Sequence, residues 1–175
     1  MSDATDSEAV ALLKNDLIDS VRLLHDSGTP TEILANYVGA RRRWGIRLAP
    51  VLRPASRVWR LGVLLLGVEG NLYSIGGLIR AAPVGRPQNL SLSAEERRAY
   101  RAAAERGRIP PGSTINFNAR LLTLTASALQ KEDHILFVRN GTIWVRWSSQ
   151  SSEPREAREY ITERVAFLVS PFEGS

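Results

Sequence analysis

The segment His134-Ile135-Leu136-Phe137-Val138-Arg139-Asn140-Gly141-Thr142-Ile143-Trp144-Val145-Arg146-Trp147 gives the clearest structural signal in this sequence. Asn140-Gly141 favours a two-residue hairpin turn, because both positions tolerate a positive φ angle, and such a turn fixes the register of its strands. The predicted pairs on one face are Val138 with Ile143, Leu136 with Val145 and His134 with Trp147, and on the other face Phe137 with Trp144 and Ile135 with Arg146. Both faces of this hairpin therefore carry apolar pairs.

A second hairpin is predicted in the apolar middle of the chain. Its strands cover 58–66 and 72–79, joined by the turn Gly67-Val68-Glu69-Gly70-Asn71. The first strand lacks a polar face, which indicates a strand covered on both sides. The Gly76-Gly77 pair in the second strand predicts a bulge or a close backbone approach. A further extended segment is expected over 115–125.

Four helices are expected around these strands. The first ends at Gly28 and carries an apolar stripe at helical spacing, made of Val10, Leu13, Leu17, Val21 and Leu24. Thr29-Pro30-Thr31-Glu32 matches a capping box and predicts a second helix over 33–38. Ser93-Ala94-Glu95-Glu96 is a second capping box, which begins a helix that ends near Gly107. The last helix is expected over 154–168, and residues 126–133 fit either a short helix or a loop.

The order of these elements predicts an α+β fold. We expect an antiparallel sheet of about five strands, built from the two hairpins and one extended segment, with the four helices packed on it. A chain of 175 residues with 43% hydrophobic residues is long enough for a real core, so a single domain over 1–175 is expected. Residues 1–6 and 170–175 are expected to be disordered.

Missing residue types and motifs exclude several classes of function. The chain has no cysteine, which excludes disulfides, iron–sulfur clusters, thiolate metal sites and cysteine nucleophiles. It contains no phosphate-binding loop, dinucleotide fingerprint, nucleophile elbow or zinc-protease motif. The longest apolar run, 61–68, is well short of the roughly 20 residues of a membrane helix, and the N-terminus does not resemble a secretory signal. We therefore expect a cytoplasmic protein with no membrane segment, no cofactor and no metal.

The basic charge of the chain is concentrated in its middle. Residues 33–94 contain nine basic residues and one acidic residue, whereas residues 1–32 contain two basic and seven acidic residues. Arginine interleaved with tryptophan is typical of surfaces that grip phosphates and stack bases. The alternative is a basic edge that pairs with the acidic first helix or with another subunit, since no reading helix or aromatic ribonucleoprotein box accompanies the charge. The candidate polyanion-binding residues are Arg41, Arg42, Arg43, Trp44 and Arg47, in a basic run that continues through Arg53, Arg57, Trp59 and Arg60.

Other polar residues suggest a small-ligand site. His134 follows Glu132 and Asp133, and a carboxylate–imidazole group can perform acid–base chemistry, although strand-edge histidines beside acids are common. Asn116 and Asn118 alternate around Phe117 and can bind the polar edge of a ligand, or else satisfy the backbone of the preceding turn. His25, beside Asp26 at the end of the first helix, is assigned a structural role.

Three functions follow from these observations. The favoured one is a non-enzymatic binding or scaffolding domain that acts as a homo-oligomer or with a protein partner, because the hairpins are apolar on both faces and the helices that could cover them are short or alanine-rich. The first alternative is nucleic-acid or polyanion binding through the segment from Arg41 to Arg60. The second is a small-ligand domain or enzyme that uses His134 and its neighbouring carboxylates.

Overall fold

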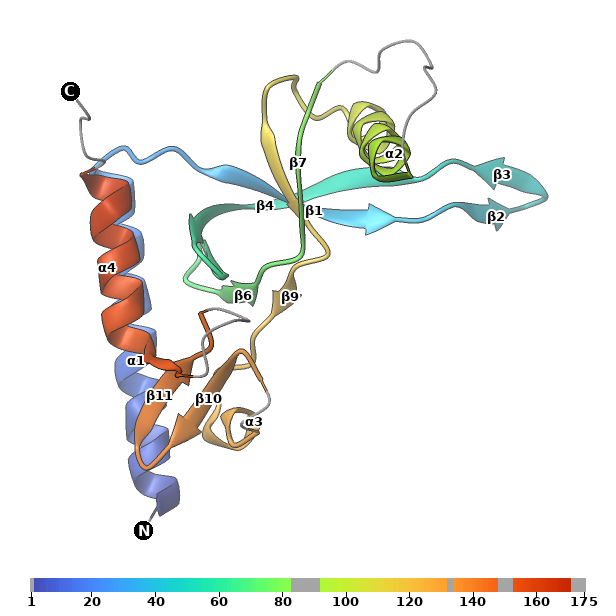
Figure 1. The fold of residues 1–175 in the computed structure, drawn as a ribbon. Coiled ribbons are helices and arrows are strands. Elements are labelled where there is room, and N and C mark those ends of the chain that lie inside the picture. Colours follow the sequence, from blue (N-terminus) through green and yellow to red (C-terminus); the bar gives the residue numbers. More distant parts are fainter. Residues whose placement is uncertain (1, 83–91, 132–133, 148–152, 171–175) are drawn as a thin grey trace. The chain divides into compact units, whose positions relative to one another are not determined.

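The computed structural model describes residues 2–82, 92–131, 134–147 and 153–170 (Figure 1). The chain divides into two compact units, and each has its own apolar core. The first unit comprises Met1–Pro30, Trp59–Ser74 and Leu121–Ser175, and the second comprises Thr31–Val58 and Ile75–Arg120. The predicted α+β class is confirmed. The assignment of 1–175 to a single domain stays a prediction.

Two long helices form much of the first unit. Helix α1 (Ser2–Asp26) packs against α4 (Ala157–Val169), as Figure 1 shows. The predicted stripe of α1 faces the core, where Leu13, Leu17 and Leu24 are almost completely buried. Helix α1 includes most of the N-terminal residues for which disorder was expected, and residues 171–175 lie outside the described part of the chain.

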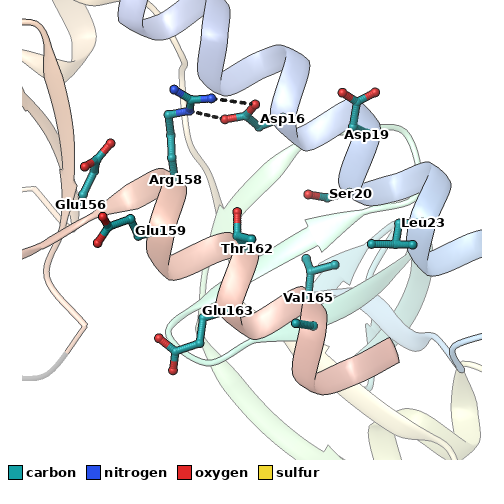
Figure 2. Close-up of a pocket in the computed structure, with 11 residues that line it drawn as sticks. Asp16, Asp19, Ser20, Leu23, Glu156, Arg158, Glu159, Thr162, Glu163 and Val165 are labelled. Carbon is teal, nitrogen blue, oxygen red and sulfur yellow. Dashed lines mark hydrogen bonds and ion pairs between the residues drawn. The ribbon is translucent and has the colours of Figure 1, made fainter. Parts of the chain in front are cut away.

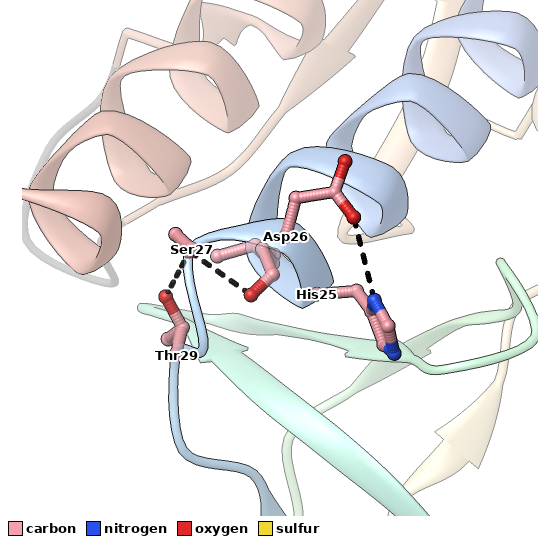
Figure 3. A network of polar contacts seen from close by, with 5 residues as sticks. His25, Asp26, Ser27 and Thr29 are labelled. Carbon is pink, nitrogen blue, oxygen red and sulfur yellow. Dashed lines mark hydrogen bonds and ion pairs between the residues drawn. The ribbon is translucent and has the colours of Figure 1, made fainter.

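The end of α1 explains why no helix follows it (Figure 3). The backbone N–H of Thr29 donates to the Leu24 carbonyl (3.1 Å) and that of Gly28, at φ +68°, donates to the His25 carbonyl (3.0 Å). This is a Schellman closure. The Ser27 hydroxyl donates to the Leu24 carbonyl (3.0 Å) and lies 2.8 Å from the Thr29 hydroxyl. Thr29 therefore closes α1 and does not cap a second helix. His25 is exposed, with Nδ1 3.4 Å from Oδ1 of Asp26.

The second predicted helix is wrong, because these residues form strand β1 (Glu32–Val38). Strand β1 is central: it pairs antiparallel with β4 (Val51–Leu61) and parallel with β8 (Thr114–Phe117). Pairing on both edges, which depends on residues far away in the sequence, overrides the local capping signal. Strand β7 (Gly77–Arg80) lies antiparallel to β8.

Helix α2 (Leu92–Arg106) begins at Leu92, so Ser93, the predicted cap, lies within the helix. The helix contributes to the core of the second unit. Ala103 and Ala104 are buried, and the ring of Tyr100 contacts those of Tyr37 and Phe117. The predicted close approach at Gly76-Gly77 is confirmed, since a Cβ atom on Gly76 would lie 2.3 Å from the Phe117 carbonyl oxygen.

The middle hairpin is confirmed in part. Strands β5 (Leu64–Gly67) and β6 (Leu72–Ser74) pair around the predicted turn, and β5 is completely buried, as expected. The predicted strand 58–66, however, is interrupted at Gly62, where φ is +66° and a Cβ atom would meet the Tyr160 hydroxyl at 2.2 Å. That buried hydroxyl donates to the Leu61 carbonyl (3.0 Å) and accepts from the Val63 N–H (3.1 Å), so α4 holds this turn.

The Asn140-Gly141 hairpin has the predicted register. Strands β10 (Leu136–Arg139) and β11 (Thr142–Val145) pair Leu136 with Val145, Phe137 with Trp144 and Val138 with Ile143. The two pairs predicted beyond them lie outside the strands, although the Arg146 N–H donates to the Ile135 carbonyl (2.9 Å). One face joins the core of the first unit. On the other face Phe137 is fully buried, with the guanidinium groups of Arg139 and Arg146 over its ring.

The sheets are larger and more numerous than predicted. The main sheet has seven strands in the order β7-β8-β1-β4-β5-β6-β9, where β9 is Arg120–Leu121, and it is mixed because β1 and β8 are parallel. The β10–β11 hairpin does not join this sheet. It forms a three-stranded sheet with β12 (Arg155–Glu156). Of the two structures considered for 126–133, a short helix or a loop, the helix is found at Ala126–Leu129 (α3).

Candidate nucleic-acid interface

Residues 41–48 form a two-stranded antiparallel ribbon, here called the arm. Strand β2 (Arg41–Arg43) pairs with β3 (Ile46–Leu48), and the arm continues the β1–β4 pair beyond its last rung, Val38 with Val51 (Figure 1). The turn residues Trp44 and Gly45 have φ angles of +53° and +77°. Two positive φ angles are the mark of a type I′ turn, the commonest two-residue hairpin connection. The sequence analysis predicted no hairpin here, and the signal that could have indicated one is Gly45, which follows Arg41-Arg42-Arg43-Trp44 and precedes Ile46-Arg47.

The arm is solvent-exposed. All of its residues are exposed except the partly buried Leu48, and Trp44 retains 90% of its accessible surface. The arm contains four arginines and no acidic residue. None of these arginines forms an ion pair with any residue that the structure describes. Their charges are therefore available to a ligand.

The arm carries positive charge on both of its faces. Alternation along the strands places Arg41 and Arg43 on one face and the directly opposed pair Arg42 and Arg47 on the other. Next to a two-residue turn, this second rung is a non-hydrogen-bonded pair, in which side chains approach most closely, with Cβ atoms about 5 Å apart. Like charges directly opposite each other destabilise a ribbon. Phosphate groups bound one to each guanidinium would remove that repulsion, and phosphate matches the geometry of arginine.

Trp44, at the tip of the arm, has an unfavourable backbone conformation. A bulky aromatic residue at positive φ is a genuine outlier, because its Cβ crowds the backbone, and such a conformation costs on the order of 1 kcal/mol or more. Trp44 adopts it at +53° while exposing a large apolar ring. Neither the conformation nor the exposure stabilises the fold, so the residue is explained better by an external contact.

The rest of the basic segment differs from the arm in exposure. Trp59 is buried, and its Nε1 donates to the Thr29 carbonyl (3.0 Å), so it is not available to stack on a base. Arg53 and Arg57 are exposed on β4, whereas Arg60 is partly buried. The candidate residues Arg41, Arg42, Arg43, Trp44 and Arg47, in contrast, all lie on the arm.

The residues of the suggested small-ligand site lie in different units. Asn116 is buried in β8 of the second unit and donates from Nδ2 to Oε2 of Glu32 (2.7 Å). Asn118 lies beyond β8 with φ +56° and is exposed, so the two amides do not alternate along one regular strand as expected. His134 belongs to the first unit, is partly buried and donates from its backbone N–H to the Lys131 carbonyl (3.2 Å). Its neighbours 132–133 lie outside the described residues.

A groove of about 740 Å³ lies between α1 and α4 (Figure 2). Its apolar floor includes Leu23 and Val165. Arg158 makes two hydrogen bonds to the Asp16 carboxylate, one of them 3.2 Å from Nη2 to Oδ1, and these contacts raise the pKa of Arg158 above its ordinary value. The carboxylates around the groove belong to Asp16, Asp19, Glu156, Glu159 and Glu163. Sequence reasoning missed this groove because it requires the pairing of two distant helices, whose contacting residues Asp16 and Arg158 are 142 positions apart.

Within the described residues, no group of three or more histidine or carboxylate side chains is placed to hold a metal ion. None of the helices in these ranges has a stretch both long and apolar enough to cross a bilayer. Comparison of the chain with protein-family models, with curated proteins and with solved structures finds no match. The function must therefore be inferred from the side chains themselves, and the arm has the most specific arrangement.

Proposed function

We propose that this chain is a binding protein that engages nucleic acid through the arm. The observation that carries the proposal is the opposed pair Arg42 and Arg47 on an exposed ribbon, where no carboxylate of the described residues forms an ion pair with either. Arginine binds phosphate bidentately, and each phosphate neutralised releases counterions, which drives association. Such binding requires no cofactor or metal and suits the expected cytoplasmic location.

The proposal reverses the order of preference that the sequence suggested. Binding to a second copy or a protein partner was favoured because the two hairpins were expected to expose apolar faces. In the Asn140-Gly141 hairpin, Leu136, Phe137, Val138, Ile143 and Val145 are all buried. The argument for a protein partner from exposed apolar hairpin faces is therefore weaker. The arm, in contrast, is both exposed and positively charged.

The salt dependence of binding tests the proposal. Labelled single- and double-stranded oligonucleotides are titrated at several salt concentrations with the wild-type chain and with Arg42→Gln/Arg47→Gln. We expect affinity to fall steeply with salt, and the slope of log K against log salt to decrease by about 2 in the variant, because each lost phosphate contact removes about 0.9.

A matched variant separates the arm from overall charge. Arg97→Gln/Arg108→Gln removes two exposed arginines of the same unit that lie outside the arm, and should leave the slope close to that of the wild type. Absence of binding to either kind of oligonucleotide at low salt would sink the proposal. An equal loss in both variants would mean that only net charge matters, which would also contradict it.

A homo-oligomer or protein-binding scaffold remains the second candidate. The observation in its favour is the acidic groove between α1 and α4, in whose lining Leu23 is half exposed. Light scattering over micromolar concentrations tests self-association: a mass that rises to a multiple of 19.3 kDa supports it, and a monomeric mass throughout contradicts it.

A further inference from the structure

The arm is charged on both faces and apolar at its tip, and this arrangement restricts the form of the nucleic acid. We infer that the arm inserts tip-first into the major groove of double-stranded DNA, with arginines against the phosphates of both strands and Trp44 at the base pairs. The inference rests on the proposed function and specifies its ligand.

The first step concerns which surfaces of the arm need a partner. Arg41 and Arg43 point to one side of the ribbon, and Arg42 and Arg47 to the other. A single strand lying on one face would leave the charges of the opposite face unsatisfied. Single-strand binding proteins typically offer a basic groove that follows one backbone. The arm is a projecting ribbon, so it requires a concave partner with anions on both sides, which a duplex groove provides.

The second step concerns size. A ribbon with side chains on both faces is about 10 Å thick, judged from the spacing of packed sheets. The major groove of B-form DNA is about 12 Å wide and accepts a two-stranded ribbon, whereas the minor groove is only about 6 Å wide. The major groove of A-form RNA is too narrow for side chains to read. Thickness therefore favours the DNA major groove.

The third step concerns depth. Three strand residues at about 3.4 Å each extend about 10 Å, which is comparable with the depth of the major groove, about 8.5 Å. The arm has three residues in each strand before the turn. In this orientation Arg41, Arg42 and Arg47 lie nearer the phosphates. Trp44 and Ile46, the partner of Arg43 in the rung next to the turn, lie nearer the floor of the groove, where thymine methyl groups offer apolar contacts. These two residues are 90% and 65% exposed in the free chain.

The main test variant is Trp44→Asn. Asparagine tolerates the +53° φ angle better than tryptophan and creates the favoured Asn-Gly turn, so the variant removes the ring without weakening the hairpin. Unchanged circular dichroism and an unfolding midpoint at least equal to that of the wild type verify this. Any loss of DNA binding then belongs to the ring itself.

The experiment measures fluorescence anisotropy of a labelled duplex and of each of its separated strands. We expect the duplex to bind more tightly than either strand, methyl green, a major-groove ligand, to displace the protein, and netropsin, a minor-groove ligand, to leave it bound. Trp44→Asn should weaken duplex binding about tenfold, the equivalent of one good apolar contact, without changing the salt slope, because the ring carries no charge.

The outcomes separate this inference from the proposed function. Equal or tighter binding to single strands, displacement by netropsin alone, or full affinity in Trp44→Asn would overturn insertion into the major groove. If the salt slope still depended on Arg42 and Arg47 in those cases, the proposed function would stand. If the wild-type chain bound neither the duplex nor the single strands, both the inference and the proposed function would be refuted.

Discussion

Two hairpins of this chain share one turn geometry and differ in almost everything else. The turn Asn140-Gly141 has φ angles of +53° and +71°, and Trp44-Gly45 has +53° and +77°. The first uses the residue pair that this backbone favours, whereas the second places a tryptophan at a position that disfavours it. The strands of the first are largely buried, and those of the second are exposed. The same turn geometry therefore occurs in a hairpin that packs into the core and in a hairpin that exposes its side chains to solvent.

The two turns also differ in their contacts: Asn140-Gly141 touches other parts of the chain, whereas Gly45 has open space around it. The Gly141 N–H donates to Oδ1 of the nearly buried Asp6 (2.9 Å), and a Cβ atom on Gly141 would lie 2.5 Å from Cγ2 of Thr5. A Cβ atom on Gly45 would meet nothing within 4 Å. A two-stranded ribbon alone is marginally stable. The arm thus keeps features that a stability optimum would remove, as expected of a functional segment.

The largest expected effect that distinguishes the hairpins comes from Gly141→Ala compared with Gly45→Ala. Both variants force alanine into positive φ, which costs about 1–2 kcal/mol. Gly141→Ala also crowds Thr5, so we expect the free energy of unfolding to fall by about 2 kcal/mol. Gly45→Ala should barely shift the urea midpoint, because the strain is confined to an arm that can open locally without loss of core contacts.

Equal destabilisation by the two variants would break this comparison, since it would mean that the arm belongs to the cooperative core. Amide hydrogen exchange of residues 41–48 provides the second measurement. We expect these amides to exchange faster than those of β10 and β11 in the wild-type chain.

A smaller effect is expected from the hydrogen bond that fixes the buried turn. Asp6→Ala removes the acceptor of the Gly141 N–H and should lower the free energy of unfolding by about 1 kcal/mol. Asp6→Asn keeps an oxygen acceptor of the same shape and loses the same charge. The difference between the two variants therefore isolates the hydrogen bond, and identical urea midpoints would show that it contributes nothing.

Sequence reasoning succeeded where local signals decide structure. The Asn140-Gly141 turn sets its own register, and the stripe of α1 recurs within one helix, so neither required knowledge of distant residues. It failed at β1, because Glu32, interpreted as part of a capping box, instead accepts a hydrogen bond from Asn116, 84 residues away. Strand pairing with β4 and β8 depends on such non-local partners, which a local pattern does not contain.

The residues of the candidate site could be predicted from the sequence, but their exposure and their arrangement on the two faces of the arm could not. The five residues from Arg41 to Arg47 were identified by charge and aromatic content, yet Trp59, in the same basic run, is buried. Composition does not distinguish an exposed ring from a core ring. Alternation between the faces of the arm, which carries the inference of groove insertion, becomes visible only when the turn at Trp44-Gly45 sets the strand register.

The smallest expected effect concerns the third strand, which the buried hairpin has and the arm lacks. Arg155 of β12 donates to Oε2 of Glu163 on α4 (2.7 Å), and this hydrogen bond lowers the pKa of Glu163 below its ordinary value of 4.5. A lowered pKa in the folded chain means that the pair stabilises it above pH 4.5 and that this contribution disappears as the pH falls and Glu163 becomes protonated. Urea unfolding of Glu163→Gln should therefore show a small deficit at pH 7 that closes on acidification. Glu159→Gln, which removes a carboxylate of α4 without an ion pair to any described residue, is the matched control. A deficit that is the same for both variants, or that persists at low pH, would show that the pair does not secure β12.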